Sequence, residues 1–215
     1  HHASSVSAHD KLLRLQNHLR KSEAGDEAVL LLTRLDDIAW LTNLRGSDIA
    51  FNPVFLSWAL ISQEKATLFV NEKVLSPEVT RHLCEAGWAT APYETIFNSL
   101  RELCDQKRPV LAKPTDLNAR IHSLLGDCYV AYRQPVPLWK AVKTPQEIEG
   151  LKAVMKADGA AIEAFIEELK ERLERGEHLT ENDAVDILHA KRAAIPGFIG
   201  ESFGTIAAVN GNAAM

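Results

Sequence analysis

The stretch VFLSWALISQEKATLFV, residues 54–70, decides the fold of this chain. Two apolar runs, 54–62 and 66–70, flank the polar segment SQEK. Short apolar runs bounded by polar residues are typical of buried strands, and a connection of about four residues suits two antiparallel neighbours. The stretch therefore predicts a β-hairpin.

Outward from this hairpin, helix-like and strand-like segments alternate. Apolar spacing predicts helices in residues 9–22, 34–44, 76–87, 93–107 and 116–126, and strands in residues 27–33, 88–93, 109–113 and 128–132. Such alternation is typical of an α/β sheet with helices on both faces. The hairpin adds an antiparallel strand, so we expect a mixed, mainly parallel sheet.

A proline-rich segment marks the first domain boundary. Pro135, Pro137 and Pro145 lie close together and are expected to hold the chain extended, which ends the sheet-forming region. His1 and His2 are typical of an expression tag. The expected division is a tag or disordered stretch, an α/β domain, and the start of a second domain: residues 1–8, 9–139 and 140–215.

Two helices are predicted after the boundary, each with a capping signal. Thr144 and Glu147 form a capping box that begins a long amphipathic helix. Thr180 and Asp183 repeat the device for a second helix. Residues 198–215 are expected to form one or two strands with an Asn-Gly turn.

Composition excludes several classes of function. The formal net charge is −5 and no basic run occurs, so a nucleic-acid partner is not expected. No apolar run reaches the length of a membrane span, and no signal peptide is recognisable, so we expect a cytoplasmic protein. The odd, widely spaced cysteines favour three reduced thiols over a disulfide framework or a zinc site: Cys84, Cys104 and Cys128.

Motifs for catalysis are weak within the chain. No nucleotide-binding glycine pattern and no H-E-x-x-H zinc motif occurs. Asp36 and Asp37 could be read as paired carboxylates, but neighbours on a helix point about 100° apart. We therefore expect them to share no site and to act as negative charge at a helix N-terminus.

The loop NLRGSDIAFNPVF, residues 43–55, carries an unusual charge pattern and has two interpretations. Arg45 and Asp48 could pair and close the loop on itself, with Asn52 holding the backbone. Alternatively, Arg45 presents a fixed cation, and Asp48 or Asn52 a fixed acceptor, to a neighbouring domain or a peptide terminus.

Three segments resemble the Xaa-Pro aminopeptidase (aminopeptidase P) family. LDDIAWLTNLRGSDIAFNPVFLSWALI (residues 35–61) resembles its middle domain, which is of the creatinase N-terminal type. KAVKTPQEIEGLKAVMKADGAA (residues 140–161) is similar to the first helices of its pita-bread α+β catalytic domain, and FIGESFGTIAAVNGNAA (residues 198–214) is similar to a strand of that domain.

The resemblance implies an enzyme that releases the N-terminal residue from short peptides with proline in second position. It implies a homodimer and two divalent metal ions, usually manganese, held by two Asp, one His and two Glu that fall after Met215. No metal ligand and no catalytic residue are expected in this chain, which would then be inactive alone. The substrate-binding residues implied here are Phe203, Arg45 and Asp48. The alternatives are a non-catalytic peptide- or protein-binding module and a prolidase or creatinase relative.

Overall fold

The computed structural model describes residues 6–213 and divides the chain into two compact units. The first unit contains residues 1–49 and 53–143, and the second contains residues 50–52 and 144–215. The division after Lys143 lies four residues beyond the end expected for the α/β domain. Of the stretch expected to be a tag, residues 1–5 lie outside the described residues, and Ala8 begins the first helix.

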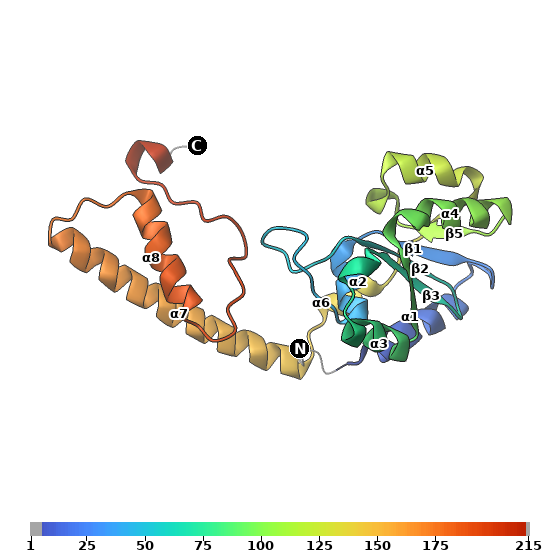
Figure 1. Cartoon of the computed structure of the whole chain (residues 1–215), viewed down its shortest axis with the longest axis horizontal. Coiled ribbons are helices and arrows are strands. Elements are labelled where there is room, and N and C mark those ends of the chain that lie inside the picture. Colours follow the sequence, from blue (N-terminus) through green and yellow to red (C-terminus); the bar gives the residue numbers. More distant parts are fainter. Residues whose placement is uncertain (1–5, 214–215) are drawn as a thin grey trace. The chain divides into compact units, whose positions relative to one another are not determined.

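A six-stranded sheet forms the centre of the first unit (Figure 1). In spatial order the strands are β4 (Trp88–Pro92), β3 (Ala66–Val70), β2 (Ser57–Ile61), β1 (Val29–Leu32), β5 (Val110–Ala112) and β6 (Tyr129–Ala131). The strand β2 is antiparallel to both of its neighbours, and every other pair is parallel. The predicted mixed, mainly parallel sheet is confirmed.

The central hairpin is fixed by its own turn. Ser57 pairs with Val70 and Ile61 with Ala66, which leaves the predicted SQEK connection between β2 and β3. The backbone N–H of Ser62 donates to the carbonyl of Lys65 at 2.8 Å, and the Ser62 hydroxyl accepts from the Lys65 N–H at 3.0 Å. Local hydrogen bonds therefore set the register of both strands.

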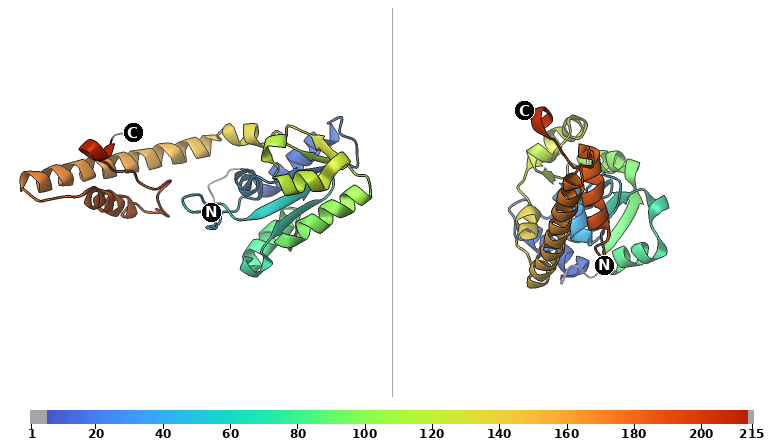
Figure 2. Two further views of the ribbon diagram at one scale, coloured as in Figure 1. Left: turned by 90° about the horizontal axis from the view of Figure 1, so that it is seen from above. Right: turned by 90° about the vertical axis from the view of Figure 1, so that its left-hand side faces the viewer.

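Helices cover both faces of the sheet (Figures 1 and 2). They are α1 (Ala8–Arg20), α2 (Leu35–Thr42), α3 (Pro77–Glu85), α4 (Ile96–Asp105), α5 (Ala119–Leu125) and α6 (Val136–Ala141). Short 3₁₀ turns η1 (Glu72–Val74), η2 (Tyr93–Thr95), η3 (Pro114–Asp116) and η4 (Gly126–Cys128) join some of them to strands. The helix α3 starts as predicted, with Ser76 as N-cap and Pro77 in the first turn.

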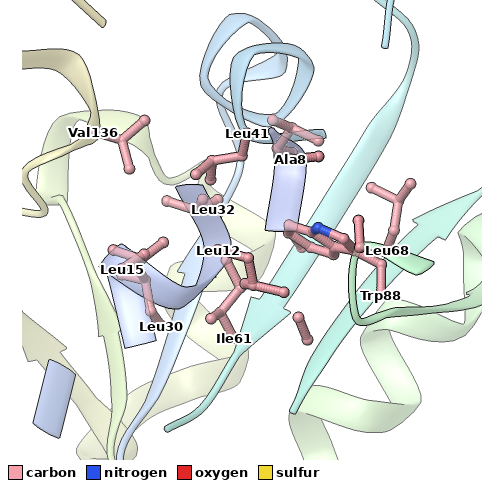
Figure 3. Packing of buried hydrophobic residues seen from close by; sticks show 14 of the residues in the cluster. Ala8, Leu12, Leu15, Leu30, Leu32, Leu41, Ile61, Leu68, Trp88 and Val136 are labelled. Carbon is pink, nitrogen blue, oxygen red and sulfur yellow. The ribbon is translucent and has the colours of Figure 1, made fainter. Parts of the chain in front are cut away.

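Two apolar clusters hold these layers together. In β1, Leu30 and Leu32 belong to the cluster on one face, while Val29 and Leu31 belong to the cluster on the other. The first cluster joins the sheet to α1, α2, α3 and α6, and Figure 3 shows part of it. The second joins the sheet to α4 and α5. A strand buried on both faces reads as a continuous apolar run, which is the pattern of residues 29–32.

The proline-rich segment is helical where an extended chain was predicted. Residues Val136–Ala141 form α6, with Pro137 in its first turn. Proline is tolerated there because the N–H that it lacks would have no helical partner. Buried Val136 packs in the first apolar cluster, so α6 is part of the α/β unit.

The second unit consists mainly of two helices, α7 (Pro145–Glu174) and α8 (Glu181–Ala193). Both predicted capping boxes, at Thr144 and Thr180, are present. The Arg192 guanidinium on α8 donates to Asp158 on α7 at 2.7 Å, which ties the two helices together. Within residues 6–213, no helix has both the length and the apolar character needed to cross a bilayer.

The strand predicted in residues 198–215 is absent from its described part. Residues 198–209 are irregular, and a 3₁₀ turn, η5 (Asn210–Ala213), follows. A strand is stable only when a neighbour pairs with its N–H and C=O groups. No described residue of the second unit supplies such a neighbour, so the apolar and β-branched pattern was not sufficient.

Candidate functional site

The loop of residues 43–56 leaves α2 in a fixed direction. Asn43 ends the helix in the left-handed conformation, with φ of 56°. Its side-chain amide donates to the Val6 carbonyl at 3.0 Å, and its side-chain oxygen accepts from the Lys11 ammonium. Asparagine tolerates the left-handed region better than most residues, so the sequence suits this sharp exit.

The loop closes on itself through its backbone. The N–H of Gly46 donates to the Pro53 carbonyl and that of Asp48 to the Val54 carbonyl, both at 3.3 Å. The Asp48 carboxylate accepts from the N–H of Leu56 at 2.8 Å. These bonds satisfy polar groups on both arms of the loop and hold the arms side by side.

The Arg45 side chain binds backbone carbonyls at the end of α2 and does not pair with Asp48. Its Nη1 donates to the carbonyls of Ala39 at 3.0 Å and Leu44 at 2.8 Å. Among the described residues no ion pair joins Arg45 to Asp48, and the Asn52 side chain makes no hydrogen bond. The prediction that Arg45 pairs with Asp48 is therefore wrong. Both side chains nevertheless stabilise the loop, through hydrogen bonds to backbone groups. A cation beside the last carbonyls of a helix is electrostatically favourable.

A groove of about 850 Å³ lies beside this loop, wholly within the first unit. Part of its lining comes from the loop, including the two residues just before β2. The rest comes from the ends of β3 and β4, the turns that follow these strands, and α3. The carboxyl ends of parallel strands are a usual place for ligands in α/β folds. The volume is in the range of small-ligand sites, about 300–1,000 Å³.

The lining combines apolar walls with charges of both signs. Val70 and Val79 supply apolar surface, while Arg45, Asp48 and Glu72 supply charge. Such a surface can hold an extended peptide, because its side chains meet apolar walls and its polar ends meet charged groups. We take this groove, with Arg45 and Asp48 on its rim, as the candidate binding site.

Tyr93 adds a neutral donor to the groove. Burial raises the pKa of its hydroxyl above the ordinary value, and the nearby Glu94 carboxylate raises it further. The ring of Trp58 lies 5.6 Å from that of Tyr93, centroid to centroid, and supports its position. The sequence analysis missed this wall, because it did not predict that β3 and β4 are neighbours in the sheet.

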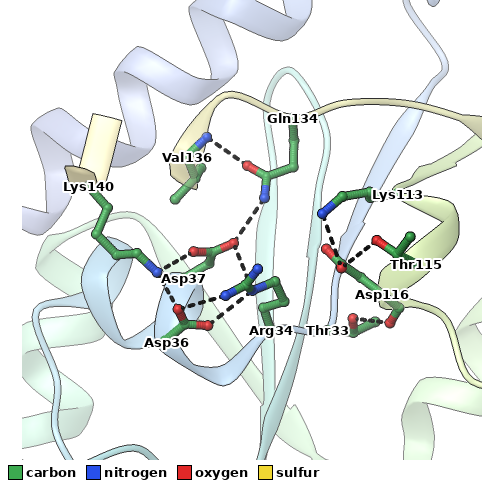
Figure 4. Close-up of polar contacts among 10 residues, drawn as sticks. All are labelled: Thr33, Arg34, Asp36, Asp37, Lys113, Thr115, Asp116, Gln134, Val136 and Lys140. Carbon is green, nitrogen blue, oxygen red and sulfur yellow. Dashed lines mark hydrogen bonds and ion pairs between the residues drawn. The ribbon is translucent and has the colours of Figure 1, made fainter. Parts of the chain in front are cut away.

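A second group of polar residues, the polar cluster, lies at the same edge of the sheet (Figure 4). It consists of Arg34, Asp36, Asp37, Gln134 and Lys140. The Lys140 ammonium on α6 contacts both carboxylates and lies 2.7 Å from Asp37 Oδ1. Asp37 is fully buried and also accepts from the Gln134 amide at 3.0 Å.

The expectation that Asp36 and Asp37 share no site is therefore wrong. Their side chains do diverge on α2, but the long, flexible stem of Lys140 reaches between them. Both still lie in the first turn of α2, as predicted, where negative charge suits the helix dipole.

Asp36 and Lys140 of the polar cluster favour each other's charged forms. Burial raises the pKa of the Asp36 carboxyl, but hydrogen bonds from Lys140 and Arg34 outweigh it and leave the pKa below its ordinary value. Burial lowers the pKa of the Lys140 ammonium, but its bonds to Asp36 and Asp37 outweigh that effect and raise it. Both groups therefore carry charge near neutral pH.

The polar cluster has no room for a substrate. The cavity beside Arg34, Asp37 and Gln134 measures about 10 Å³, which is the space of about one water molecule. Gln134 accepts from the Val136 N–H at 2.7 Å, so its amide joins Asp37 to the start of α6. The arrangement holds α6 against α2 and is structural.

The remaining predicted site residue, Phe203, lies in the second unit. Its side chain is 71% exposed. The structure thus places Arg45 and Asp48 together on one groove and Phe203 in the other unit. Across residues 6–213, no three His, Cys, Asp or Glu side chains gather as the ligands of a metal ion would.

Gly46→Ala should destabilise the first unit. A Cβ at this position would lie 2.7 Å from the Cβ of Phe55 and 3.1 Å from the Val54 carbonyl oxygen, so the two arms of the loop must separate. We expect a loss of about 1–3 kcal/mol in the free energy of unfolding, measured in urea. Ser47→Ala is the neighbouring control and should unfold like the wild type; equal stability of all three proteins would contradict the close approach.

Lys140→Met should destabilise the contact between α6 and α2. The substitution keeps an unbranched side chain, one atom shorter, but leaves the buried Asp37 carboxylate without its ammonium. Removing one partner of a buried pair costs about 3 kcal/mol, which denaturant unfolding would measure. Lys143→Met, at an exposed lysine whose ammonium donates to the Lys140 carbonyl, is the matched control. A loss below that of the control would show that the pair does not stabilise the unit.

Acid should weaken the same contact through Asp36. A carboxyl whose pKa is lowered in the folded state stabilises the fold above its ordinary pKa, and this contribution is lost as the pH falls through the folded pKa. Below pH of about 4, the melting temperature of the wild type should approach that of Asp36→Asn. A constant difference between the two proteins from neutral pH to pH of about 2 would contradict this linkage.

Comparisons with known proteins place the chain in a family. The family model of the creatinase/prolidase N-terminal domain matches residues 1–147. Xaa-Pro aminopeptidase 1 of Dictyostelium discoideum is 34% identical over 97% of this chain, which covers 33% of that protein. A probable Xaa-Pro aminopeptidase P of Podospora anserina is 38% identical over 95% of this chain, which covers 31% of it. The chain thus spans about a third of these relatives.

Solved structures show the same relationship. The X-prolyl aminopeptidase of Caenorhabditis elegans, described as a cytosolic enzyme with a di-nuclear active site, superposes with a TM-score of 0.88 and 25% identity. The superposition covers 96% of this chain and 34% of that one. The Xaa-Pro dipeptidase of Bacillus anthracis shares the fold with a TM-score of 0.58 at 16% identity, over 86% of this chain and 48% of that one. The fold, the family match and the relatives agree, and the chain belongs to the creatinase/prolidase N-terminal domain family.

Proposed function

We propose that this chain is the non-catalytic part of a metal-dependent Xaa-Pro aminopeptidase, which releases the N-terminal residue from peptides with proline in second position. The observation that carries the proposal is similarity to such enzymes along 97% of the chain, although the chain spans only 33% of the relative. The amide before proline is tertiary, so a dedicated enzyme must accept a bond that lacks an N–H.

The groove beside residues 43–56 would guide the peptide. Arg45 and Asp48 are held by backbone partners, so their charges are fixed before a peptide arrives. A preorganised rim lowers the entropic cost of ordering a flexible ligand. In this role the groove selects short, extended peptides and the chemistry takes place elsewhere.

The described residues, 6–213, do not fit the metal centre that such chemistry uses. Within the described part, no three side chains of the ligand types lie together. A pair of divalent ions needs several carboxylate and imidazole ligands. No catalytic step is therefore assigned to Arg45, Asp48 or Phe203, whose roles are to bind and orient the peptide.

A binding module without catalysis is the second candidate. It is favoured by the groove, which the first unit builds alone with both apolar and charged lining. If it holds, the isolated chain binds Xaa-Pro peptides in calorimetry, and joining it to the rest of a relative adds no hydrolysis.

A homodimer stays a prediction from the resemblance. Light scattering coupled to size-exclusion chromatography would measure the mass of the particle. A particle with the mass of one chain at micromolar concentration would argue against a stable dimer of this chain.

A chimera tests the aminopeptidase proposal. This chain replaces the corresponding third of the Dictyostelium discoideum relative, and release of the first residue from an Xaa-Pro peptide is measured with and without manganese. We expect manganese-dependent release by the chimera and none by the chain alone. Arg45→Ala in the chimera should lower kcat/KM by about 10- to 100-fold through loss of a charged contact to the peptide.

Arg101→Ala is the matched control for this variant. Arg101 is exposed on α4, bonds to Asn98 and does not line the groove. Circular dichroism confirms that each variant is folded, because Arg45 also holds the end of α2. Equal kcat/KM for both arginine variants would reject a role of Arg45 in binding the peptide.

A further inference from the structure

We propose that Cys104 and Cys128 are a reversible disulfide pair, formed by exchange with a small disulfide such as oxidised glutathione. Both are free thiols in the structure, and neither belongs to the candidate binding site. The inference goes beyond the proposed function, because it concerns a modification of the opposite edge of the sheet.

The fold brings the two thiols together from separate elements. Cys104 lies near the end of α4, and Cys128 is the last residue of the turn η4. The Cys128 thiol donates to the Cys104 carbonyl at 3.6 Å, and the Cys104 thiol donates to the Leu125 carbonyl at 3.8 Å.

The position of this pair is fixed by apolar packing. Leu100 and Leu103 of α4 and Ile121 and Leu125 of α5 are buried in one cluster, in which Cys104 is partly buried. Figure 1 shows α4 and α5 on the same face of the sheet. The Cys128 thiol thus lies against the backbone of Cys104 in the folded state, and this proximity favours closure of a disulfide over reaction with a second molecule.

Exchange proceeds in two balanced steps. The Cys128 thiolate, after losing its proton to solvent, attacks glutathione disulfide; an S–S bond to glutathione forms and one glutathione thiolate leaves. The Cys104 thiolate then attacks the Cys128 sulfur, the protein disulfide forms and the second glutathione leaves as thiolate. The two protein thiols lose two electrons in total, and one glutathione disulfide gains them.

The environment of Cys104 sets this order. Burial, followed by the hydrogen bond to Cys128, raises the pKa of the Cys104 thiol to about 11. A thiol with so high a pKa is rarely ionised near neutral pH, so it is a poor first nucleophile. Once Cys128 carries glutathione, the attack by Cys104 is intramolecular and is helped by proximity.

The disulfide would crosslink the chain next to the amino ends of β5 and β6. Cys104 precedes β5 and Cys128 precedes β6, so the bond joins two positions 24 apart in sequence and encloses β5 and α5. A crosslink of this kind stabilises a protein mainly by restricting the unfolded chain. The groove lies at the carboxyl ends of β3 and β4, so the disulfide would not involve any residue of its lining.

The purified chain, incubated with millimolar oxidised glutathione, tests the proposal. We expect titration of the unfolded protein to find one thiol instead of three, and the intact mass to fall by two hydrogen atoms. A non-reducing peptide map should join the peptides of Cys104 and Cys128. The melting temperature should rise by about 5–10 °C and return to its first value after dithiothreitol.

Three serine variants complete the design. Cys84→Ser is the control: Cys84 is exposed on α3, and the variant should still form the crosslink. In Cys104→Ser, the remaining Cys128 should stop at the mixed disulfide and gain the mass of one glutathionyl group.

Cys128→Ser should react more slowly than Cys104→Ser, because burial, the largest cause of the raised pKa of Cys104, remains in this variant. Three thiols left after incubation, a crosslink to Cys84, or a disulfide between two molecules would overturn the proposal. The peptide map of the wild type identifies the crosslinked cysteines without any variant. It therefore tests the proposal even if a serine variant fails to fold.

Discussion

The buried carboxylate of Asp37 is the constraint on which the arrangement of the first unit depends. A charge that is shielded from water must be paired and hydrogen-bonded, and here Lys140 and Gln134 supply both. These two partners come from the end of the α/β unit, about a hundred positions further along the chain. Their contacts hold α6 against α2. The end of α2 in turn sets the direction in which residues 43–56 continue.

Local signals explain why much of the fold could be predicted. The hairpin of β2 and β3, the N-cap at Ser76 and the capping boxes at Thr144 and Thr180 depend on residues a few positions apart, so the sequence shows them directly. The strand expected in residues 198–215 depends on a distant neighbour for its hydrogen bonds, and no periodicity reveals whether that neighbour exists. The prolines predict an extended segment, but the first turn of a helix accepts proline, and α6 forms there.

The candidate site was predictable only in part, for the same reason. The charge pattern of residues 43–55 identified Arg45 and Asp48, which do line the groove. Their actual partners are backbone groups, which a sequence cannot display. The opposite wall, with Tyr93 and Glu72, comes from strands that meet the loop only after the sheet has formed. The link from Lys140 to Asp36 and Asp37 likewise needs the tertiary fold.

The antiparallel direction of β2 has a consequence for how the loop of residues 43–56 can vary in sequence and length. The strand β2 starts at Ser57, on the side of the sheet where its neighbours β1 and β3 end, so α2 and the loop from Asn43 connect β1 to β2 on that one side. Its length and composition can therefore change without altering any strand register. Exchange of this loop between relatives would keep the strand pairing of the sheet, provided that the glycine at position 46 is transferred with the loop.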